Sequence, residues 1–267
     1  MRTVSGRGDT VVVVGAGLGG LAAAMHLAAA GRNVTVVERE AVPGGRCGLI
    51  HDHGYRFDTG PTVLTMPDLL ARPFEALGES LEDWVTLHRL DPAYRARFAD
   101  GSTIDVHTDV DAMADEIAMT CSPADSAGYR RFVEFLRALY DIEMPHFIAR
   151  NLDTPVQLLG APLVSLLARG GFRRLAPKVA QFFQDERLRR LFSFQAMYAG
   201  LAPADALAIY AVITYMDCVR GVYSPQGGMH EVPRALAGAA PARRSSRPPA
   251  TTGCSWSTTR YGRPARA

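Results

Sequence analysis

The chain has 267 residues, of which 48% are hydrophobic, so it can bury a sizeable core in one or two domains. Its 29 basic and 27 acidic residues give a formal net charge of +2, but six arginines and no acidic residue follow Ala240, which leaves 23 − 27 = −4 up to that residue. The basic excess therefore lies at the end of the chain, and it gives no argument for nucleic-acid binding.

Residues 11–20 read V-V-V-V-G-A-G-L-G-G, which predicts a strand, a glycine-rich turn and a helix. Four consecutive valines favour a central parallel strand that is buried on both faces. In such a turn the first glycine permits the tight bend, the second lets the backbone approach a pyrophosphate, and the third lets the helix pack close to the strand. We therefore expect phosphates at the helix N-terminus, held by Gly15, Ala16, Gly17, Leu18 and Gly20.

The helix is expected over residues 18–30, since alanine is abundant there and Gly31 follows, and a return strand is expected over residues 34–37. Glu38 ends that strand, where a carboxylate can accept hydrogen bonds from both ribose hydroxyls of an adenosine. This carboxylate would repel the 2′-phosphate of NADP. Arg39, the next residue in the chain, is a further candidate for cofactor binding. A glycine turn alone can be a plain corner, but here strand, turn, helix, strand and acid occur in register.

A second glycine turn, G-G-R at residues 44–46, distinguishes FAD from NAD, whose domain does not need it, and the run G-Y-R-F-D-T-G-P-T follows at residues 54–62. The second run predicts a strand ending in a small-residue turn that can lie against a flavin ring; the alternative is a hairpin with a Gly-Pro corner. The additional cofactor-binding candidates are Gly45, Arg46, Gly60, Pro61 and Thr62. Asp58 is the acid nearest this corner; the alternative is that its side chain caps the turn. No residue is assigned as a catalytic base.

The middle of the chain is predicted to be a β-hairpin followed by helices. Residues 94–98 and 103–107 flank Asp100-Gly101, a strong hairpin signal. Residues 109–119 predict a short helix, and Ser122-Pro123 begins a long one as N-cap and first-turn proline. Residues 155–219 continue helical, with breaks at prolines and glycines. Apolar residues recur at helical spacing in the long helix and predict core packing: Tyr129, Phe132, Val133, Leu136, Leu139 and Tyr140.

Residues 166–194 mix seven basic residues with five phenylalanines. One interpretation is an interfacial surface that lies on an anionic membrane and admits a lipid-soluble substrate; the other is a helix pair with solvated arginines. The fold class is therefore α/β: an incomplete Rossmann-like FAD-binding domain with an inserted β-hairpin and a helical lobe for substrate or membrane. We expect the FAD-binding part with the hairpin over residues 1–108, the helical lobe over 109–222, and a return segment over 223–240.

Two stretches resemble the bacterial phytoene desaturase family, within the wider flavoprotein superfamily of amine oxidases and phytoene desaturases. They are G-G-R followed by Y-R-F-D-T-G-P-T-V-L-T-M-P, and Y-S-P-Q-G-G-M running into V-P-R-A-L at residues 223–236. The resemblance spans residues 9–240. It implies hydride transfer from an allylic C–H of phytoene, or a related polyene, to flavin N5, by a protein on the cytoplasmic side, peripherally associated with the inner face of the membrane. The alternatives are an amine oxidase and a non-catalytic isoprenoid lipid carrier on the same fold.

Family members are about twice as long as this chain, and after Ala240 the composition changes abruptly, with little aliphatic content. We therefore interpret residues 241–267 as an out-of-frame tail without a core, and expect the chain as written to be truncated and a poor enzyme. The alternative is a genuine disordered tail.

The remaining patterns predict absences. Cys47, Cys121, Cys218 and Cys254 show no paired spacing and predict free thiols in a reducing compartment. The first ten residues lack the apolar core of a signal peptide, and the most apolar window, residues 206–216, is too short to cross a bilayer. Cys47, His51 and His53 could suggest a metal site, but an alternating His-Asp-His is more often surface and no fourth ligand lies nearby, so no metal is expected. No nucleophile motif is present, so the chemistry is expected to come from the flavin.

Overall fold

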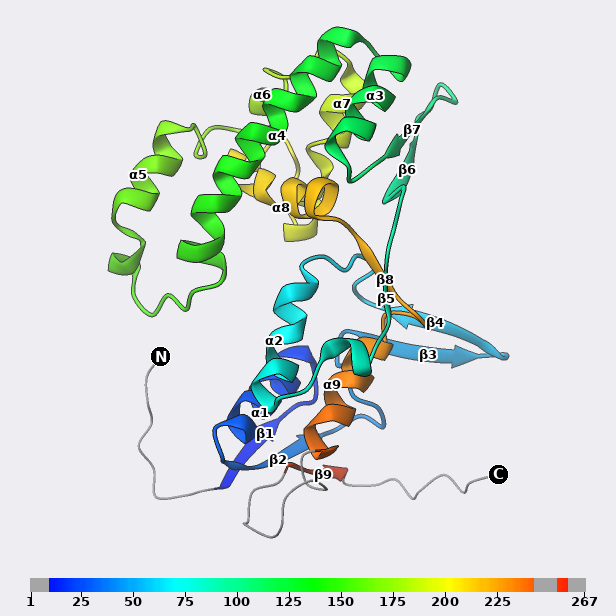
Figure 1. Cartoon of the computed structure of the whole chain (residues 1–267), viewed down its shortest axis with the longest axis vertical. Helices are drawn as coiled ribbons and strands as arrows, with labels where there is room; N and C mark the ends of the chain where they lie inside the picture. The colour runs from blue at the N-terminus through cyan, green and yellow to red at the C-terminus, as the bar shows by residue number, and fades with distance from the viewer. Residues whose placement is uncertain (1–9, 243–253, 259–267) are drawn as a thin grey trace. The chain divides into compact units, whose positions relative to one another are not determined.

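The computed structural model describes residues 10–242 and 254–258, and within them two compact units (Figure 1). We call Arg89–Val222 the helical unit, and the chain up to His88 together with the chain from Tyr223 the split unit. The first unit boundary differs from the one expected at residue 108. The predicted hairpin belongs to the helical unit, because Ile104 and Val106 are fully buried in its core.

The split unit contains the predicted strand–helix–strand motif. Strand β1 (Thr10–Val14) leads through the glycine turn into α1 (Leu18–Ala29) and then β2 (Asn33–Glu38). The two strands are parallel, with Val14 opposite Val37. This register brings the turn after β1 and the end of β2 to the same edge of the sheet, which is where ligands bind in such folds.

The rest of the split unit comes from both ends of the chain. Helix α1 packs against α2 and α9. The core between them is apolar and includes Leu21, Phe74 and Leu236. The further elements are β3 (Gly48–Asp52), β4 (Tyr55–Thr59), α2 (Pro67–Leu77), β5 (Leu87–Arg89), β8 (Tyr223–Pro225) and α9 (Glu231–Ala242), with β3 antiparallel to β4 and β5 paired with β8.

The expectation that β1 is buried on both faces is wrong for the described residues. Val12 and Val14 are exposed, while Val11 and Val13 are half-buried. Among the described elements β1 pairs only with β2, so it is an edge strand. The valine run therefore predicted the strand correctly but not its surroundings.

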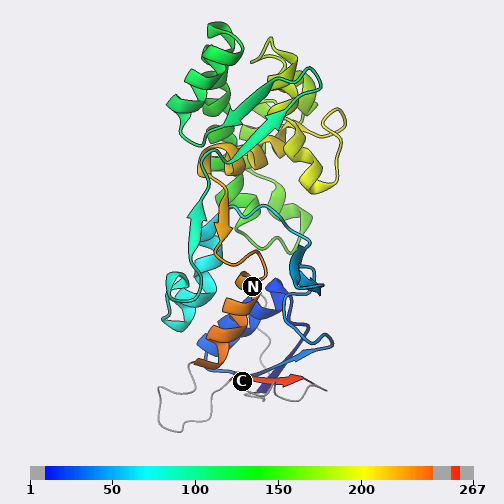
Figure 2. The same ribbon diagram turned by 90° about the vertical axis from the view of Figure 1, so that its right-hand side faces the viewer.

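The tail contains a strand that the sequence did not predict. Cys254–Thr258 forms β9, which pairs in parallel with β2 and places Val34 opposite Cys254 (Figure 2). Its sequence, C-S-W-S-T, combines an aromatic with a β-branched residue, which suits a strand better than a disordered tail. Residues 243–253 and 259–267 lie outside the described residues, as do residues 1–9, to which the signal-peptide expectation applies.

The helical unit follows the predicted order, and two of its helices begin with side-chain caps, of which Ser122 was predicted. The Asp109 side chain accepts hydrogen bonds from the first turn of α3, and Ser122 Oγ accepts one from Asp125 N in α4. Its elements are β6 (Tyr94–Arg97), β7 (Thr103–Val106), α3 (Val110–Thr120), α4 (Pro123–Glu143), α5 (Ala161–Ala168), α6 (Leu175–Val179), α7 (Glu186–Leu191) and α8 (Ala211–Tyr215). Pro162 and Pro177 lie inside α5 and α6 rather than between helices.

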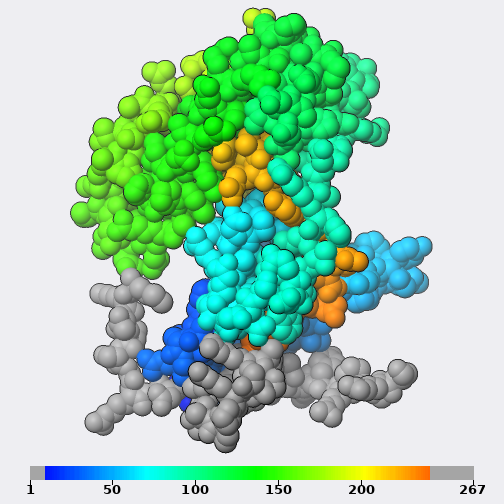
Figure 3. All heavy atoms as spheres, viewed as in Figure 1, coloured from blue at the N-terminus to red at the C-terminus, as the bar shows by residue number. Residues whose placement is uncertain are grey.

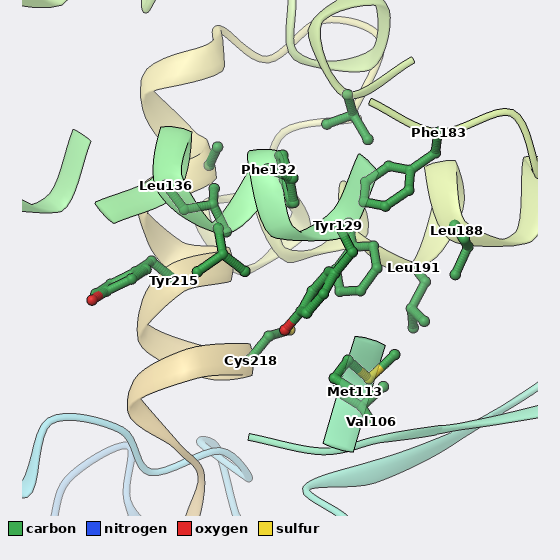
Figure 4. Packing of buried hydrophobic residues seen from close by; sticks show 14 of the residues in the cluster. Val106, Met113, Tyr129, Phe132, Leu136, Phe183, Leu188, Leu191, Tyr215 and Cys218 are labelled. Atoms are coloured by element: carbon green, nitrogen blue, oxygen red, sulfur yellow. The ribbon is translucent and has the colours of Figure 1, made fainter. Parts of the chain in front are cut away.

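The predicted stripe of α4 forms the core of this unit. Five of its six residues are buried, and Tyr140 is partly buried. Figure 4 shows Tyr129 and Phe132 beside Phe183, with Leu188 and Leu191 from α7 close by. The Phe132 and Phe183 rings meet edge to face with centroids 5.3 Å apart. These buried phenylalanines argue against a wholly interfacial surface over residues 166–194.

One close approach fixes α4 against the chain before α7. Asp125 is buried, and its Oδ1 accepts a hydrogen bond of 2.5 Å from Gln184 N while its Oδ2 accepts one of 2.7 Å from Ser122 Oγ. One turn later, a Cβ at Gly128 would lie 2.0 Å from Phe182 O. The carboxylate and the glycine therefore hold the two backbones together.

Glu143, the last residue of α4, is buried, and its Oε1 has no hydrogen-bond partner among the described residues. Burial raises the pKa of Glu143 to about 8. The unfolded carboxyl ionises at its ordinary, lower pKa, so the stability contributed by the neutral acid is present below that value and is lost as the pH rises towards 8.

Glu143→Gln should therefore flatten the pH dependence of stability. We expect the loss of unfolding free energy between pH 5 and pH 8 to be smaller in the variant by at least about 1 kcal/mol. Urea unfolding at both pH values measures it, with the exposed Glu134→Gln as control. An equal loss in wild type and variant would contradict a neutral Glu143.

Candidate functional site

The glycine turn after β1 has the geometry of a nucleotide-binding turn. Gly15 has a φ of +100°, which favours glycine, and Gly15 N donates to Val37 O at 2.7 Å. A Cβ at Gly20 would lie 2.1 Å from Gly15 O, so this helix position must be glycine. The predicted close packing of helix and strand is thus present.

The first two glycines face open space. A Cβ on Gly15 or on Gly17 would have no heavy atom within 4 Å. Gly17 is the N-cap of α1 and Leu18 its first residue, so the unpaired N–H groups of the helix start lie there without a side-chain cap. This open helix N-terminus fits a pyrophosphate.

Glu38 lies beside this turn, as the register of β1 and β2 requires. Its Oε2 accepts a hydrogen bond of 2.5 Å from Ala16 N, and its Oε1 accepts one of 2.9 Å from Glu40 N. These backbone hydrogen bonds lower the pKa of Glu38. Each carboxylate oxygen can accept more than one hydrogen bond, so the ionised group retains capacity for ribose hydroxyls.

The second glycine turn meets the first. Gly44 N donates to Ala16 O at 2.8 Å, and Gly44 forms a parallel bridge with Gly17. A Cβ on Gly45, whose φ is +56°, would lie 3.3 Å from Gly17 Cα. The two glycine turns are therefore in direct backbone contact, which the sequence spacing alone could not establish.

A third turn joins this pair. A Cβ on Gly60, whose φ is +93°, would lie 1.9 Å from Arg46 O. Pro61 and Thr62 continue from it as exposed residues. The structure thus brings the predicted residues of the three turns together, whereas the Arg39 side chain is exposed and pairs with Glu40 at 2.9 Å.

Asp58 acts as a cap rather than standing free. Its two carboxylate oxygens accept hydrogen bonds from Met229 N at 2.9 Å and His230 N at 3.0 Å, just before α9. A Cβ on Gly228 would lie 2.5 Å from Asp58 Oδ2. The cap is on the segment before α9 rather than on the neighbouring turn that the sequence indicated, and it joins chain segments about 170 residues apart.

His230 is a site neighbour that the sequence did not indicate. It is buried, and its Nδ1 lies 3.0 Å from Cys47 O, in the segment that follows the second glycine turn. The signal available was its place directly before α9, next to the P-Q-G-G-M run. His230 and Asp58 together attach the return segment to the glycine turns.

Metal chemistry finds no support in the part of the chain that the structure describes, where no group of three or more potential metal-binding side chains occurs. His51 and His53 are exposed. Cys47, Cys121 and Cys218 are free thiols, and the Cys254 side chain lies outside the described residues. Within the same residues, no helix is long and apolar enough to cross a membrane.

A parallel βαβ unit with an open glycine turn, an acid at the end of the second strand and two further glycine turns defines an FAD-binding protein of the Rossmann-like class. The family model described as "Flavin containing amine oxidoreductase" matches residues 18–247. The chain belongs to this family, and the prediction of FAD as cofactor is confirmed.

The chain is 59% identical over 240 residues to phytoene dehydrogenase from Streptomyces griseus, covering 90% of this chain and 47% of that protein. It is 37% identical to the zeta-carotene-forming phytoene desaturase from Myxococcus xanthus, covering 88% and 45%. The chain thus spans about half the length of the curated relatives it matches.

Solved structures of other proteins share the fold. Cyclohexylamine oxidase from Brevibacterium oxydans matches with a TM-score of 0.51 and 18% identity, covering 86% of this chain and 49% of that chain. An oxidoreductase from Methanosarcina mazei matches with a TM-score of 0.50 and 19% identity, covering 93% and 51%. The prediction of an incomplete α/β FAD-binding fold is confirmed.

Proposed function

We propose that this chain belongs to a FAD-dependent enzyme that desaturates phytoene or a related polyene. The observation that carries the proposal is the 59% identity to a phytoene dehydrogenase, which extends across both units. The convergence of three glycine turns beside Glu38 independently supports the FAD dependence in this proposal, because such an arrangement fits FAD.

In this proposal the residues of the site have distinct roles. The backbone of Gly15, Ala16, Gly17 and Leu18 binds the pyrophosphate, while Gly20 keeps α1 close to the sheet. Glu38 accepts the ribose hydroxyls, and Arg39 lies at the rim. The turns with Gly45, Arg46, Gly60, Pro61 and Thr62 lie along the cofactor. The bound FAD supplies a hydride acceptor for an allylic C–H, and the chain's own residues bind and orient it.

The experiment is a chimera in which this chain replaces the matching half of the Streptomyces griseus relative. Anaerobic addition of phytoene should bleach the bound flavin and give a desaturated product. Bleaching by cyclohexylamine instead would favour an amine oxidase. Retention of phytoene without bleaching by either compound would favour a lipid carrier.

Replacing Glu38 by alanine should weaken FAD binding by about 1 to 3 kcal/mol, because hydrogen bonds from ribose to a charged acceptor are lost. Equilibrium dialysis measures the affinity of the 267-residue chain. The control is Glu40→Ala, which removes a neighbouring exposed carboxylate. Equal FAD affinity in wild type and Glu38→Ala would remove Glu38 from the site.

We also propose that the protein works peripherally at the inner face of the cell membrane, since a polyene substrate partitions into lipid. Basic residues predominate in residues 166–194, where Arg169, Arg173 and Arg174 are exposed. Such a cationic surface attracts anionic lipids.

A further inference from the structure

The helical unit carries an exposed apolar segment, residues 156–172, which includes α5. Every residue from 153 to 161 is exposed. Val156 is 71% and Leu159 68% exposed, and Val164 and Leu167 on α5 are 64% and 54% exposed. In Figure 3 this lime-green stretch lies on the surface of the helical unit. Apolar side chains gathered in one segment are unusual on a monomer and indicate a binding surface.

The segment is held to the unit by few buried residues. Leu166 is buried from α5, and Gly171 is buried after it. Gly171 N donates to Leu166 O at 2.9 Å, which closes the end of the helix. The exposed leucines and valines therefore lie on a segment that is fixed at its end, and they do not pack into the core of the unit.

The charges that follow the segment are positive, and one exposed acid, Asp153, lies just before it. No aspartate or glutamate occurs between Thr154 and Gln184, while four cations do: Arg169, Arg173, Arg174 and Lys178. Two of these are engaged within the unit, since Arg174 donates to Asp205 O and Lys178 Nζ lies 4.7 Å from the Phe135 ring centroid. Arg169 and Arg173 are exposed beside the apolar residues.

An apolar surface with two exposed arginines at one end matches the headgroup–acyl boundary of an anionic bilayer. A protein partner would have to supply acidic groups beside an apolar surface, whereas an anionic bilayer has both at its headgroup–acyl boundary. Helix α5 has 8 residues and so is about 12 Å long, which suits lying in the interface and is far too short to span it.

We propose that residues 156–172 insert into the headgroup–acyl boundary of a membrane containing anionic lipids and hold the helical unit on it. This rests on the proposed function only in assuming a lipid-soluble substrate. The sequence predicted a membrane interface over residues 166–194, but Phe183 and Phe192 in that range are buried. The proposal therefore places the interface earlier in the chain, over residues 156–172.

The first test is sedimentation of the purified chain with phosphatidylcholine vesicles, with and without phosphatidylglycerol. Binding should require the anionic lipid. Arg169→Gln with Arg173→Gln should weaken it about tenfold or more. Arg131→Gln with Arg137→Gln, exposed arginines of α4, is the matched charge control and should change it little. Equal weakening in both pairs would overturn the assignment to this segment.

The second test separates insertion from adsorption. Leu159→Ser with Val164→Ser should weaken binding about tenfold, whereas the equally exposed Met119→Ser with Met197→Ser should not. In a Leu159→Trp variant, phospholipids brominated on the acyl chain should quench the added fluorescence. Binding without such quenching would overturn insertion.

The outcome is independent of catalysis. Flavin bleaching by phytoene in detergent reports on the proposed function, whereas vesicle binding of the chain reports on the segment. Bleaching with no vesicle binding would overturn the inference alone, and vesicle binding with no bleaching would overturn the desaturase alone.

Discussion

Replacing Gly20 by alanine should destabilise the split unit by about 3 kcal/mol or more and abolish measurable FAD binding. The added Cβ would lie 2.1 Å from Gly15 O and 3.6 Å from a γ-methyl of Val13. Because the first contact is with backbone, no side-chain rotation relieves it. Helix α1 would have to move away from the sheet and take the open helix N-terminus with it. Urea unfolding and FAD dialysis measure the two effects.

Gly19 provides the control on the same helix turn. A Cβ there meets no heavy atom within 4 Å, so Gly19→Ala should leave stability unchanged or raise it by up to about 1 kcal/mol, as alanine favours helix. Similar losses of stability from both substitutions would show that the close contact at Gly20 is not the cause of the loss.

Replacing Asp125 by alanine should destabilise the helical unit by about 3 kcal/mol, the second large effect. The substitution leaves Gln184 N without its acceptor in a region closed off by the buried carboxylate and the Gly128 contact. Hydrogen exchange of residues 182–188 should accelerate strongly. Far-UV circular dichroism during urea unfolding gives the change in stability.

Asp125→Asn should lose less, because its amide carbonyl can still accept from Gln184 N while the charge and one acceptor oxygen are gone. Asp115→Ala, an exposed acid of α3, is the control and should have little effect. Unchanged exchange of residues 182–188 in Asp125→Ala would contradict the role of the carboxylate.

Local signals predicted the elements around the site well. Glycines at fixed spacing, an acid at the end of a strand and a capping residue act within a few residues of the chain, so Glu38 and the α4 cap lie where expected. The open space at Gly17 and the close contact at Gly20 also follow from the roles that such a motif assigns.

The contacts between distant segments could not be predicted. Asp58 had two interpretations because its partners, Met229 and His230, are about 170 residues away. The exposure of Val12 and Val14 depends on which elements cover the sheet, which a valine run does not reveal. Over residues 166–194 the composition could not separate buried phenylalanines from exposed arginines, because both occur at helical spacing.

The two ends of the helical unit meet. Leu90 N donates to Val222 O at 2.9 Å where the chain enters and leaves the unit. A segment whose ends are adjacent can be lengthened, exchanged or removed while the remaining chain still closes its own core. Recombination at these two positions would therefore exchange the whole helical unit while leaving the backbone geometry of the glycine turns intact.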